Sequence, residues 1–380
     1  MLYFDHAAST PPYESVIETQ YEVMKQHYAN PSSLHQSGVA AQKLLERARA
    51  AIAAQMRTTS GQWIFTASAT LANNAAILGV AKQYRQRGNH IITTNIEHPS
   101  VFEVMQQLEK EGFNITYLPV NEAGHITAEQ VNGAITKQTI LVSIMHINNE
   151  IGTIQPIEEI ANLLQQYPQV IFHVDAVQSI GKIDSSPEQM AIDLLTASAH
   201  KFGGPRGVGL LYKASHIQLS PIVYGGGQEL GVVPGTENVP AIVATAKAMR
   251  LTLENQENKS SYKQKLRDQL RAGIMQMKEL HLNGELPLAP HIVHFSYPGM
   301  KPEVVIHMLE QQGYLVATRS ACSSKENTPS RIIQALGRSF ESATSGIRIS
   351  IGDEHTEQDI EQLLHALQQI IQELSHLERG

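Results

Sequence analysis

The sequence predicts an α/β protein with a large, mostly parallel sheet and a smaller α/β unit at its C-terminal end. Through most of the first 250 or so residues, short apolar runs rich in β-branched residues alternate with segments of helical spacing. Strands separated by helices imply βαβ units, which produce parallel sheets. Beyond about residue 280 the pattern changes to a few short strands flanked by longer helices.

The large sheet is expected to contain at least six of these apolar runs. They are QWIFTA (62–67), HIITTN (90–95), NITYLP (114–119), TILVSIM (139–145), VIFHVDA (170–176) and IDLLTAS (192–198). Helical spacing predicts helices at 36–56, 70–87, 99–111, 127–135, 156–166 and 238–280. We therefore expect a sheet of the seven-stranded type, with helices between its strands.

The C-terminal part predicts a second, smaller unit. HIVHFS (291–296) and GIRISI (346–351) read as strands, and 301–312 and 356–375 read as helices. A chain of 380 residues is long enough for two domains. We predict a large domain over 15–255 and a small domain over 256–380, which the N-terminal segment 1–14 joins.

Composition narrows the classes of function. The chain is 42% hydrophobic and 17% charged, with a formal net charge of −7 and no basic block, so a nucleic-acid ligand is not expected. No signal peptide and no membrane-length apolar run is visible, which predicts a cytoplasmic protein without a membrane partner. A single cysteine excludes an internal disulfide and a Cys-rich metal site, and no metal is predicted.

That single cysteine, Cys322, lies in the polar stretch TRSACSS (318–324). A free cysteine often only fills space in a core, or is an incidental surface residue. Its polar neighbours argue against burial, and Arg319 and Lys325 would favour the nucleophilic thiolate. This stretch alone favours a reactive thiol only slightly.

Lys201 follows a predicted strand and Asp175 ends another, at the edge where ligands bind in an open parallel sheet. Lys201 stands among small residues in TASAHKFGGPRGVG, which would let a bulky ligand approach. A surface turn lysine and a helix-capping aspartate are the commoner explanations of such residues. Together, however, an amine and a partly buried carboxylate suit pyridoxal phosphate, which forms a Schiff base with lysine and pairs its ring nitrogen with an acid.

Other strand ends could complete a site for this cofactor. The helix that begins in SATLANN (68–74) offers free N–H groups to a phosphate, and Thr70 adds a hydroxyl. Ser198 and His200 flank the lysine, and His98 could lie against the ring. Each residue alone is more often a cap or a structural histidine, so only their joint occurrence carries weight.

These residues resemble a known family. The chain looks like a pyridoxal-phosphate-dependent cysteine desulfurase of the NifS/IscS type, within the class V aminotransferases. The resemblance runs nearly end to end, in the family's order, through YFDHAASTP (3–11), NPSSLHQSG (30–38), FTASAT (65–70), EHPSV (97–101), HINNEIGTIQ (146–155), HVDAVQ (173–178), SAHKFGGPRGVG (198–209), PGTENVP (234–240), RSACSS (319–324) and GIRISIG (346–352). It implies the aspartate aminotransferase-like fold of type I, with the cysteine loop in the small domain.

The resemblance also implies roles for individual residues. Lys201 would carry the cofactor, Asp175 would pair with its ring nitrogen, and His98 would stack on the ring and act as an acid or base. The other implied cofactor contacts are Ala69, Thr70, Asn149, Gln178, Ser198, His200 and, from the second subunit of a homodimer, Thr236. Arg348, with Asn149, would bind the substrate carboxylate, and Cys322 would accept the sulfur of L-cysteine as a persulfide.

Three stretches of the chain depart from the family pattern. Val233 stands where the family usually has an arginine before x-Gly-Thr, so a cation near the shared part of the site is missing. Ser68 and Leu71 replace a usual glycine and glutamate, and Arg319 replaces a glycine before Ser-Ala-Cys. None of these departures removes a chemical group assigned above. We therefore expect them to affect the catalytic efficiency and the choice of sulfur acceptor.

Two alternatives stay open. A selenocysteine lyase, or another class V lyase or transaminase, would share the cofactor site and not need Cys322. A weakly active paralogue, acting as a scaffold or sulfur-binding partner, would share the fold but release neither alanine nor sulfide. For a desulfurase, the acceptor protein could serve iron–sulfur cluster assembly, tRNA thiolation, or thiamine or NAD pathways.

Overall fold

A computed structural model describes residues 1–58, 62–254, 256–318 and 328–377. Its largest sheet has seven strands in the order β2-β8-β7-β6-β5-β3-β4. The strands are β2 (Trp63–Thr66), β3 (His90–Thr94), β4 (Asn114–Leu118), β5 (Thr139–Met145), β6 (Ile171–Asp175), β7 (Leu194–Ser198) and β8 (Gly209–Lys213). β8 pairs antiparallel with both β2 and β7, and the other pairs are parallel. The predicted α/β class with a large, mostly parallel sheet is confirmed.

The helices of this part begin close to the predicted positions. They are α2 (Gln36–Gln55), α3 (Ala69–Tyr84), α4 (Pro99–Lys110), α5 (Ala128–Ala134) and α6 (Ile157–Leu164). A side chain caps several of them: Ser68 accepts from the Leu71 N–H, and Thr127 forms a capping box with Gln130. α1 (Glu14–Gln26), which was not predicted, packs with α2 on α7.

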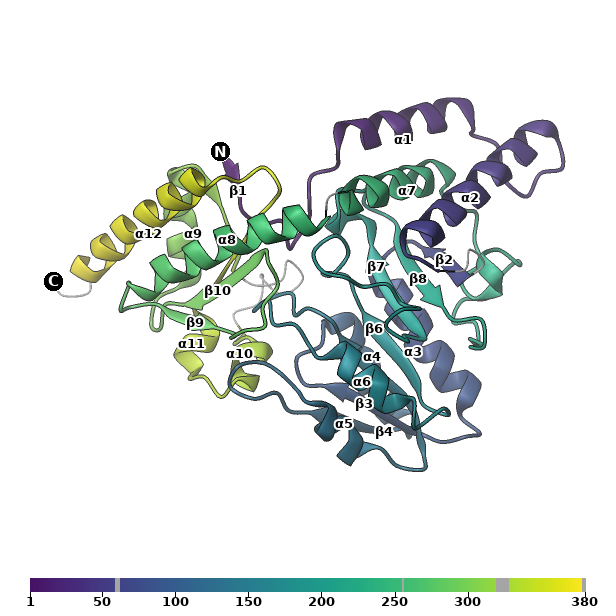
Figure 1. Cartoon of the computed structure of the whole chain (residues 1–380), viewed down its shortest axis with the longest axis horizontal. Helices are drawn as coiled ribbons and strands as arrows, with labels where there is room; N and C mark the ends of the chain where they lie inside the picture. Colours follow the sequence, from purple (N-terminus) through teal and green to yellow (C-terminus); the bar gives the residue numbers. More distant parts are fainter. Residues whose placement is uncertain (59–61, 255, 319–327, 378–380) are drawn as a thin grey trace.

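The run predicted as helical over 238–280 forms two helices, α7 (Val239–Leu253) and α8 (Gln256–Met275). Glu254 has extended dihedral angles (φ −60°, ψ 121°), which end the first helix. In Figure 1, α8 runs from the end of α7 to the smaller sheet, so the break lets the second helix change direction.

The second sheet is antiparallel and has the order β12-β10-β9. Its strands are β9 (His281–Asn283), β10 (Ile292–Ser296) and β12 (Gly346–Ser350), and its surroundings include α9 (Pro302–Gln311), α10 (Arg331–Ala335), α11 (Phe340–Thr344) and α12 (Glu357–Leu377). β1 (Leu2–Tyr3) pairs with β11 (Tyr314–Leu315), which ties the N-terminus to this part of the chain. Figure 1 shows this sheet beside the large one, with α8 and α12 over it.

Two main apolar cores accompany the two sheets. The larger one runs from Val16 to Met249 and also takes in Ile332, Ile333, Leu336 and Ala343 of α10 and α11. The smaller one contains Phe4 and residues between Leu266 and Leu374. Residues of α10 and α11 lie after residue 255 in the chain but pack in the larger core, so the two cores do not divide at that residue. The domain boundary near residue 255 stays a prediction.

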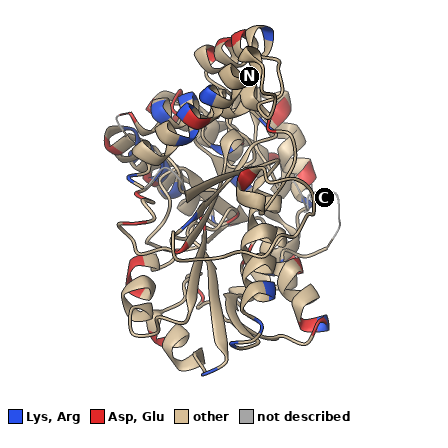
Figure 2. Ribbon diagram, turned by 90° about the vertical axis from the view of Figure 1, so that its right-hand side faces the viewer, with Lys and Arg blue, Asp and Glu red and all other residues tan. Residues whose placement is uncertain are grey.

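Charged residues are spread over the periphery of the molecule. In Figure 2, blue and red residues are interspersed along the helices rather than separated by sign. Within the described residues, no helix is both long and apolar enough to span a bilayer.

Candidate active site

A cavity of about 310 Å³ lies at the carboxyl ends of the large sheet's strands, where the smaller sheet meets it. All but two of the predicted site residues line it: Ala69, Thr70, His98, Asn149, Asp175, Gln178, Ser198, His200, Lys201 and Arg348. Thr236 is exposed and does not line the cavity, and Cys322 lies outside the described residues. The structure therefore gathers side chains from β6, β7, β12, α3 and α4 around one space.

Lys201 ends a short 3-10 turn (Ala199–Lys201) that directly follows β7. Its Nζ donates to the carbonyl oxygens of Ala7 at 2.6 Å and Ala8 at 2.9 Å. The N-terminal segment therefore crosses the mouth of the large sheet and holds the amine in the cavity wall. Gly204 follows the turn closely, since a Cβ there would lie 2.9 Å from the Ala199 carbonyl oxygen.

Asp175 is the last residue of β6 and is 5% exposed. Its Oδ2 accepts a hydrogen bond from Asn73 Nδ2 at 2.8 Å, and its Oδ1 accepts from the Val177 N–H at 3.1 Å. Two donors thus orient a buried carboxylate that faces the cavity. A cationic ring nitrogen placed beside it would be stabilised by charge as well as by a hydrogen bond.

His98 caps α4, and its Nδ1 accepts from the Ser100 N–H at 3.1 Å. Burial lowers the pKa of His98, the nearby Asp175 carboxylate opposes that shift, and Lys201 and Arg331 add to it. A neutral imidazole whose Nδ1 accepts carries its proton on Nε2. The ring can therefore offer a flat face and a single N–H to a ligand in the cavity.

The opposite end of the cavity is suited to an anion. α3 begins at Ala69 with Ser68 as its cap, and the first N–H groups of a helix have no carbonyl partner within it. Thr70 and Ser198 add hydroxyl groups to the same wall. Burial, together with Lys201 and Arg206, lowers the pKa of His200 to about 4, so this ring is neutral near pH 7.

Arg348 projects from β12 to the third side of the cavity. Its Nη1 donates to the Asn149 carbonyl oxygen at 2.7 Å and its Nη2 to Asp5 Oδ1 at 2.8 Å. Its Nε has no partner among the described residues. The guanidinium is therefore held in place by two protein groups and retains a donor.

Gln178 lines the cavity, but its amide is partly engaged elsewhere. Nε2 donates to the Ala7 carbonyl oxygen at 2.9 Å, and Oε1 lies 3.4 Å from His291 Nε2. Asn149, in contrast, has a buried Oδ1 without a partner among the described residues. Of these two amides, Asn149 is therefore the one that a ligand would satisfy.

Sequence reasoning missed three polar side chains of this wall: Asn73, Ser100 and Arg206. Asn73 Nδ2 donates to Asp175 Oδ2 and also to Ser100 Oγ, at 2.9 Å. Its position four residues after Ala69 on α3 was the available signal, since residues at that spacing share a helix face.

Glu97 was also missed, although it precedes His98. It is fully buried, and its Oε1 accepts from Thr94 Oγ1 at 2.6 Å and from the Met145 N–H at 3.1 Å. Burial raises its pKa to about 8. A neutral carboxylic acid therefore supports the strand ends behind the cavity near pH 7.

The departures from the family pattern have local explanations. Val233 is 9% exposed and belongs to the larger apolar core, so it contributes packing where a cation was expected. Ser68 has φ −167°, an extended conformation that any residue adopts, and it caps α3. The backbone at Ser68 therefore does not require glycine. Arg319 lies outside the described residues.

Comparisons with known proteins identify the family. A family model described as "Aminotransferase class-V" matches residues 2–363. "Cysteine desulfurase IscS" of Clostridium botulinum is 39% identical over 376 residues, which is 98% of this chain and 94% of the relative. "NifS/IcsS protein homolog" of Lactobacillus delbrueckii subsp. bulgaricus is 39% identical over 380 residues, 99% of each chain.

A solved structure titled "NIFS-LIKE PROTEIN" superposes with a TM-score of 0.91 at 34% identity and covers 98% of this chain and 99% of that one. Fold, site geometry and sequence similarity thus agree over nearly the whole length. The chain belongs to the class-V aminotransferase family and, within it, to the NifS/IscS type of cysteine desulfurase.

Proposed function

We propose that this chain binds pyridoxal phosphate and transfers the sulfur of L-cysteine to Cys322, with release of L-alanine. The observation that carries the proposal is the convergence of Lys201, Asp175 and His98 on one cavity whose far wall is the N-terminus of α3. The relatives named as cysteine desulfurases support the choice of substrate.

The donor set of the cavity fits this cofactor. The first N–H groups of α3, with the hydroxyls of Thr70 and Ser198 and the ring of His200, form a site for its phosphate. The oriented carboxylate of Asp175 fits a protonated ring nitrogen, and the unpartnered Asn149 Oδ1 fits a ring substituent that can donate. When bound, pyridoxal phosphate supplies an electron sink for chemistry at the α-carbon of an amino acid.

The chain's own residues then perform the remaining tasks. Lys201 Nζ holds the cofactor and moves a proton, while Asp175 keeps negative charge beside the ring. His98 lies over the cavity with its proton on Nε2, and Arg348 binds the substrate carboxylate through its oriented guanidinium. In the overall transfer, L-cysteine and the Cys322 thiol give L-alanine and a Cys322 persulfide, so atoms and electrons balance.

Absorbance and product analysis test this function. The purified chain is expected to show the visible absorbance band of lysine-bound pyridoxal phosphate and to release alanine from L-cysteine. Lys201→Ala should remove the band, and Lys110→Ala, at an exposed position on α4, should keep it. A band that persists in Lys201→Ala contradicts the lysine assignment, and faster turnover of selenocysteine than of cysteine contradicts the substrate.

We further propose a homodimer in which Thr236 completes the partner's phosphate site. An exposed apolar stripe on α1, formed by Ile17, Tyr21 and Met24, continues to Tyr28 and Leu34. A large exposed apolar surface marks an interaction site. Light scattering should show a dimer for the wild type and a shift toward monomer for Tyr21→Glu, with Lys110→Glu unchanged. A monomeric wild type contradicts this proposal.

A further inference from the structure

A second cavity, of about 430 Å³, lies on the far side of the N-terminal segment from the active site. His6 and residues Thr10 to Tyr13 line it, while the intervening Ala7 and Ala8 line the first cavity. Its other walls come from Gly181 and Lys182 after β6, from Lys263 on α8 and from Asp353 after β12. The two cavities share no lining residue, so the second is a separate space between the large and small sheets.

Lys182 and Lys263 in the cavity wall, with Lys259 beside Asp353, place three lysine side chains against two carboxylates, those of Asp353 and Glu354. Lys182 and Lys263 are both buried, at 8% and 2% exposure. Asp353 binds Lys263 Nζ through Oδ1 at 2.7 Å and lies 3.6 Å from Lys259 Nζ through Oδ2. Lys259 and Lys263 therefore already share the Asp353 carboxylate.

The state of Lys182 reflects this imbalance. Burial, and then the neighbouring Lys263, lower the pKa of Lys182 to about 7, against the opposing attraction of Asp353. A buried ammonium without a matching counter-charge is unstable and gives up its proton instead. An ordinary exposed lysine stays charged near pH 7, so added negative charge beside Lys182 would stabilise its protonated form.

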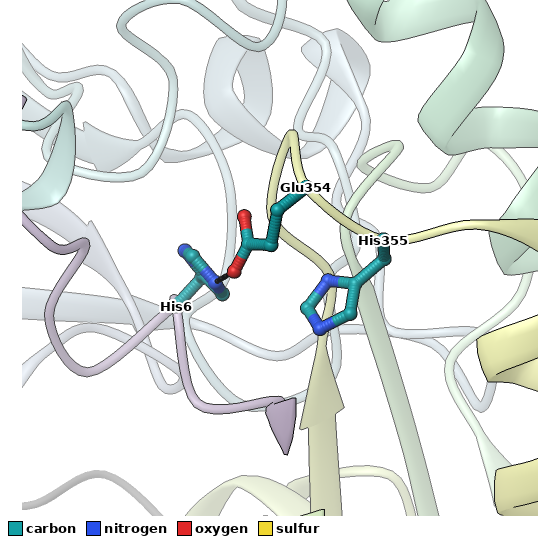
Figure 3. A group of neighbouring side chains, drawn as sticks. All are labelled: His6, Glu354 and His355. Atoms are coloured by element: carbon teal, nitrogen blue, oxygen red, sulfur yellow. Dashed lines mark hydrogen bonds and ion pairs between the residues drawn. The ribbon is translucent and has the colours of Figure 1, made fainter. Parts of the chain in front are cut away.

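The second acid of the cavity, Glu354, is already engaged. Figure 3 shows its carboxylate directed at His6, whose Nε2 lies 2.7 Å from Glu354 Oε1. His355 lies nearby, and the three side chains could in principle surround a cation. However, His355 Nδ1 accepts the Gly352 N–H at 2.8 Å, and the two buried lysines line the same cavity as His6 and Glu354. The nearby ammonium groups therefore oppose the binding of a cation there.

We propose that this second cavity is a binding site for a small oxyanion, of the carboxylate or phosphate class, which pairs with Lys182 and Lys263. The ligand would enter between the two sheets and contact the segment whose Ala7 and Ala8 carbonyl oxygens hold Lys201. Its negative charge would balance the ammonium groups that Asp353 alone does not.

Proton uptake provides a specific signature of this site. An anion beside Lys182 raises the pKa of its amine, so at about pH 8 the amine changes from mostly neutral to mostly protonated. Lys259 and Lys263 from α8 and Asp353 after β12 act on this amine, and His6, Tyr13 and Glu354 line the same cavity. His291 is also close, and its pKa is lowered by burial and then by Lys182. His291 is therefore neutral at that pH and is not the source of the uptake.

Titration calorimetry with sulfate and with malonate, in two buffers of different ionisation enthalpy, tests the proposal. Sulfate serves as the tetrahedral probe because it does not titrate near neutral pH. The chain is titrated with its pyridoxal-phosphate site filled. If it binds no such cofactor, it is titrated as purified, because the second cavity is separate from the first. We expect binding of at least one anion with uptake of a proton.

Variants separate this site from unspecific binding. Lys182→Met should weaken anion binding by about 10- to 100-fold and abolish the uptake, while Lys110→Met, at an exposed lysine, should change neither. Lys182→Arg keeps a permanent charge, so it should bind the anion without proton uptake. Absence of binding in the wild type, or unchanged affinity and uptake in Lys182→Met, overturns the proposal. If Lys182→Met does not fold, unchanged proton uptake in Lys182→Arg overturns it.

Discussion

Asn73 on α3 donates its Nδ2 hydrogen to Asp175 Oδ2 at the end of β6, over 2.8 Å. The same amide donates to Ser100 Oγ, which lies 2.8 Å from His98 Nδ1. One buried amide thus connects, directly and through Ser100, the carboxylate and the imidazole that face the cavity. We assign it a positioning role, because its amide group donates to Asp175 and to Ser100.

Asn73→Ala is expected to lower the affinity for pyridoxal phosphate and to destabilise the fold by about 1–3 kcal/mol, because Asp175 Oδ2 loses a donor in a buried site. Cofactor titration by absorbance measures the first effect and chemical unfolding the second. The matched control is Asn74→Ala, whose amide donates to the Thr70 and Ser100 carbonyl oxygens instead. Equal cofactor affinity in both variants would contradict the positioning role.

Arg348→Lys is expected to raise the KM for L-cysteine by about 10- to 100-fold, with a smaller change in kcat, because lysine cannot reproduce the planar fork of the guanidinium. Steady-state kinetics separate the two parameters. Arg338→Lys, at an exposed position, serves as the control. An unchanged KM would remove Arg348 from substrate binding.

Cys322→Ser is expected to keep the visible absorbance of the cofactor and to abolish sulfide release, because a hydroxyl cannot accept the sulfur. Mass spectrometry after incubation with L-cysteine should find one additional sulfur atom on wild-type Cys322. Full activity of the serine variant would exclude Cys322 from the reaction and favour the lyase alternative.

Glu97 predicts a specific pH dependence of stability. Its pKa is raised to about 8 from an ordinary value of 4.5, so between these values the folded chain binds a proton that the unfolded chain has lost. Its contribution to the free energy of unfolding is therefore present at low pH and decreases as pH rises through this range, by at most about 1.4 kcal/mol per pH unit.

Glu97→Gln removes this ionisation and keeps an acceptor for Thr94 and the Met145 N–H. Urea unfolding between about pH 5 and 9 should show a flatter profile for the variant than for the wild type. Glu103→Gln, on the exposed side of α4, controls for the loss of a carboxylate. Parallel profiles of the wild type and Glu97→Gln would show that Glu97 is already ionised in the folded chain.

The elements that the sequence predicts well are those whose environment is uniform. β5 reads as a strand because all seven of its residues are buried, which selects a mostly apolar run rich in β-branched residues. β8 was missed although four of its five residues are buried, because it follows the glycine-rich turn after Lys201 without an intervening helix. α7 and α8 were merged, because both have helical spacing and the break at Glu254 has no proline or glycine signal.

The sequence by itself determined which chemical groups are available, and it places Lys201, Asp175 and His98 at or just after the ends of strands. Parallel strands bring their carboxyl ends to one edge, so these groups were expected to meet there. Only the tertiary structure decided which groups pair. Asn73 and Asp175 are 102 residues apart, and Arg348 and Asp5 are 343 apart. The Lys182, Lys263 and Asp353 cluster likewise joins three separate elements. Such contacts depend on how sheets and helices pack, and local residue patterns do not encode that packing.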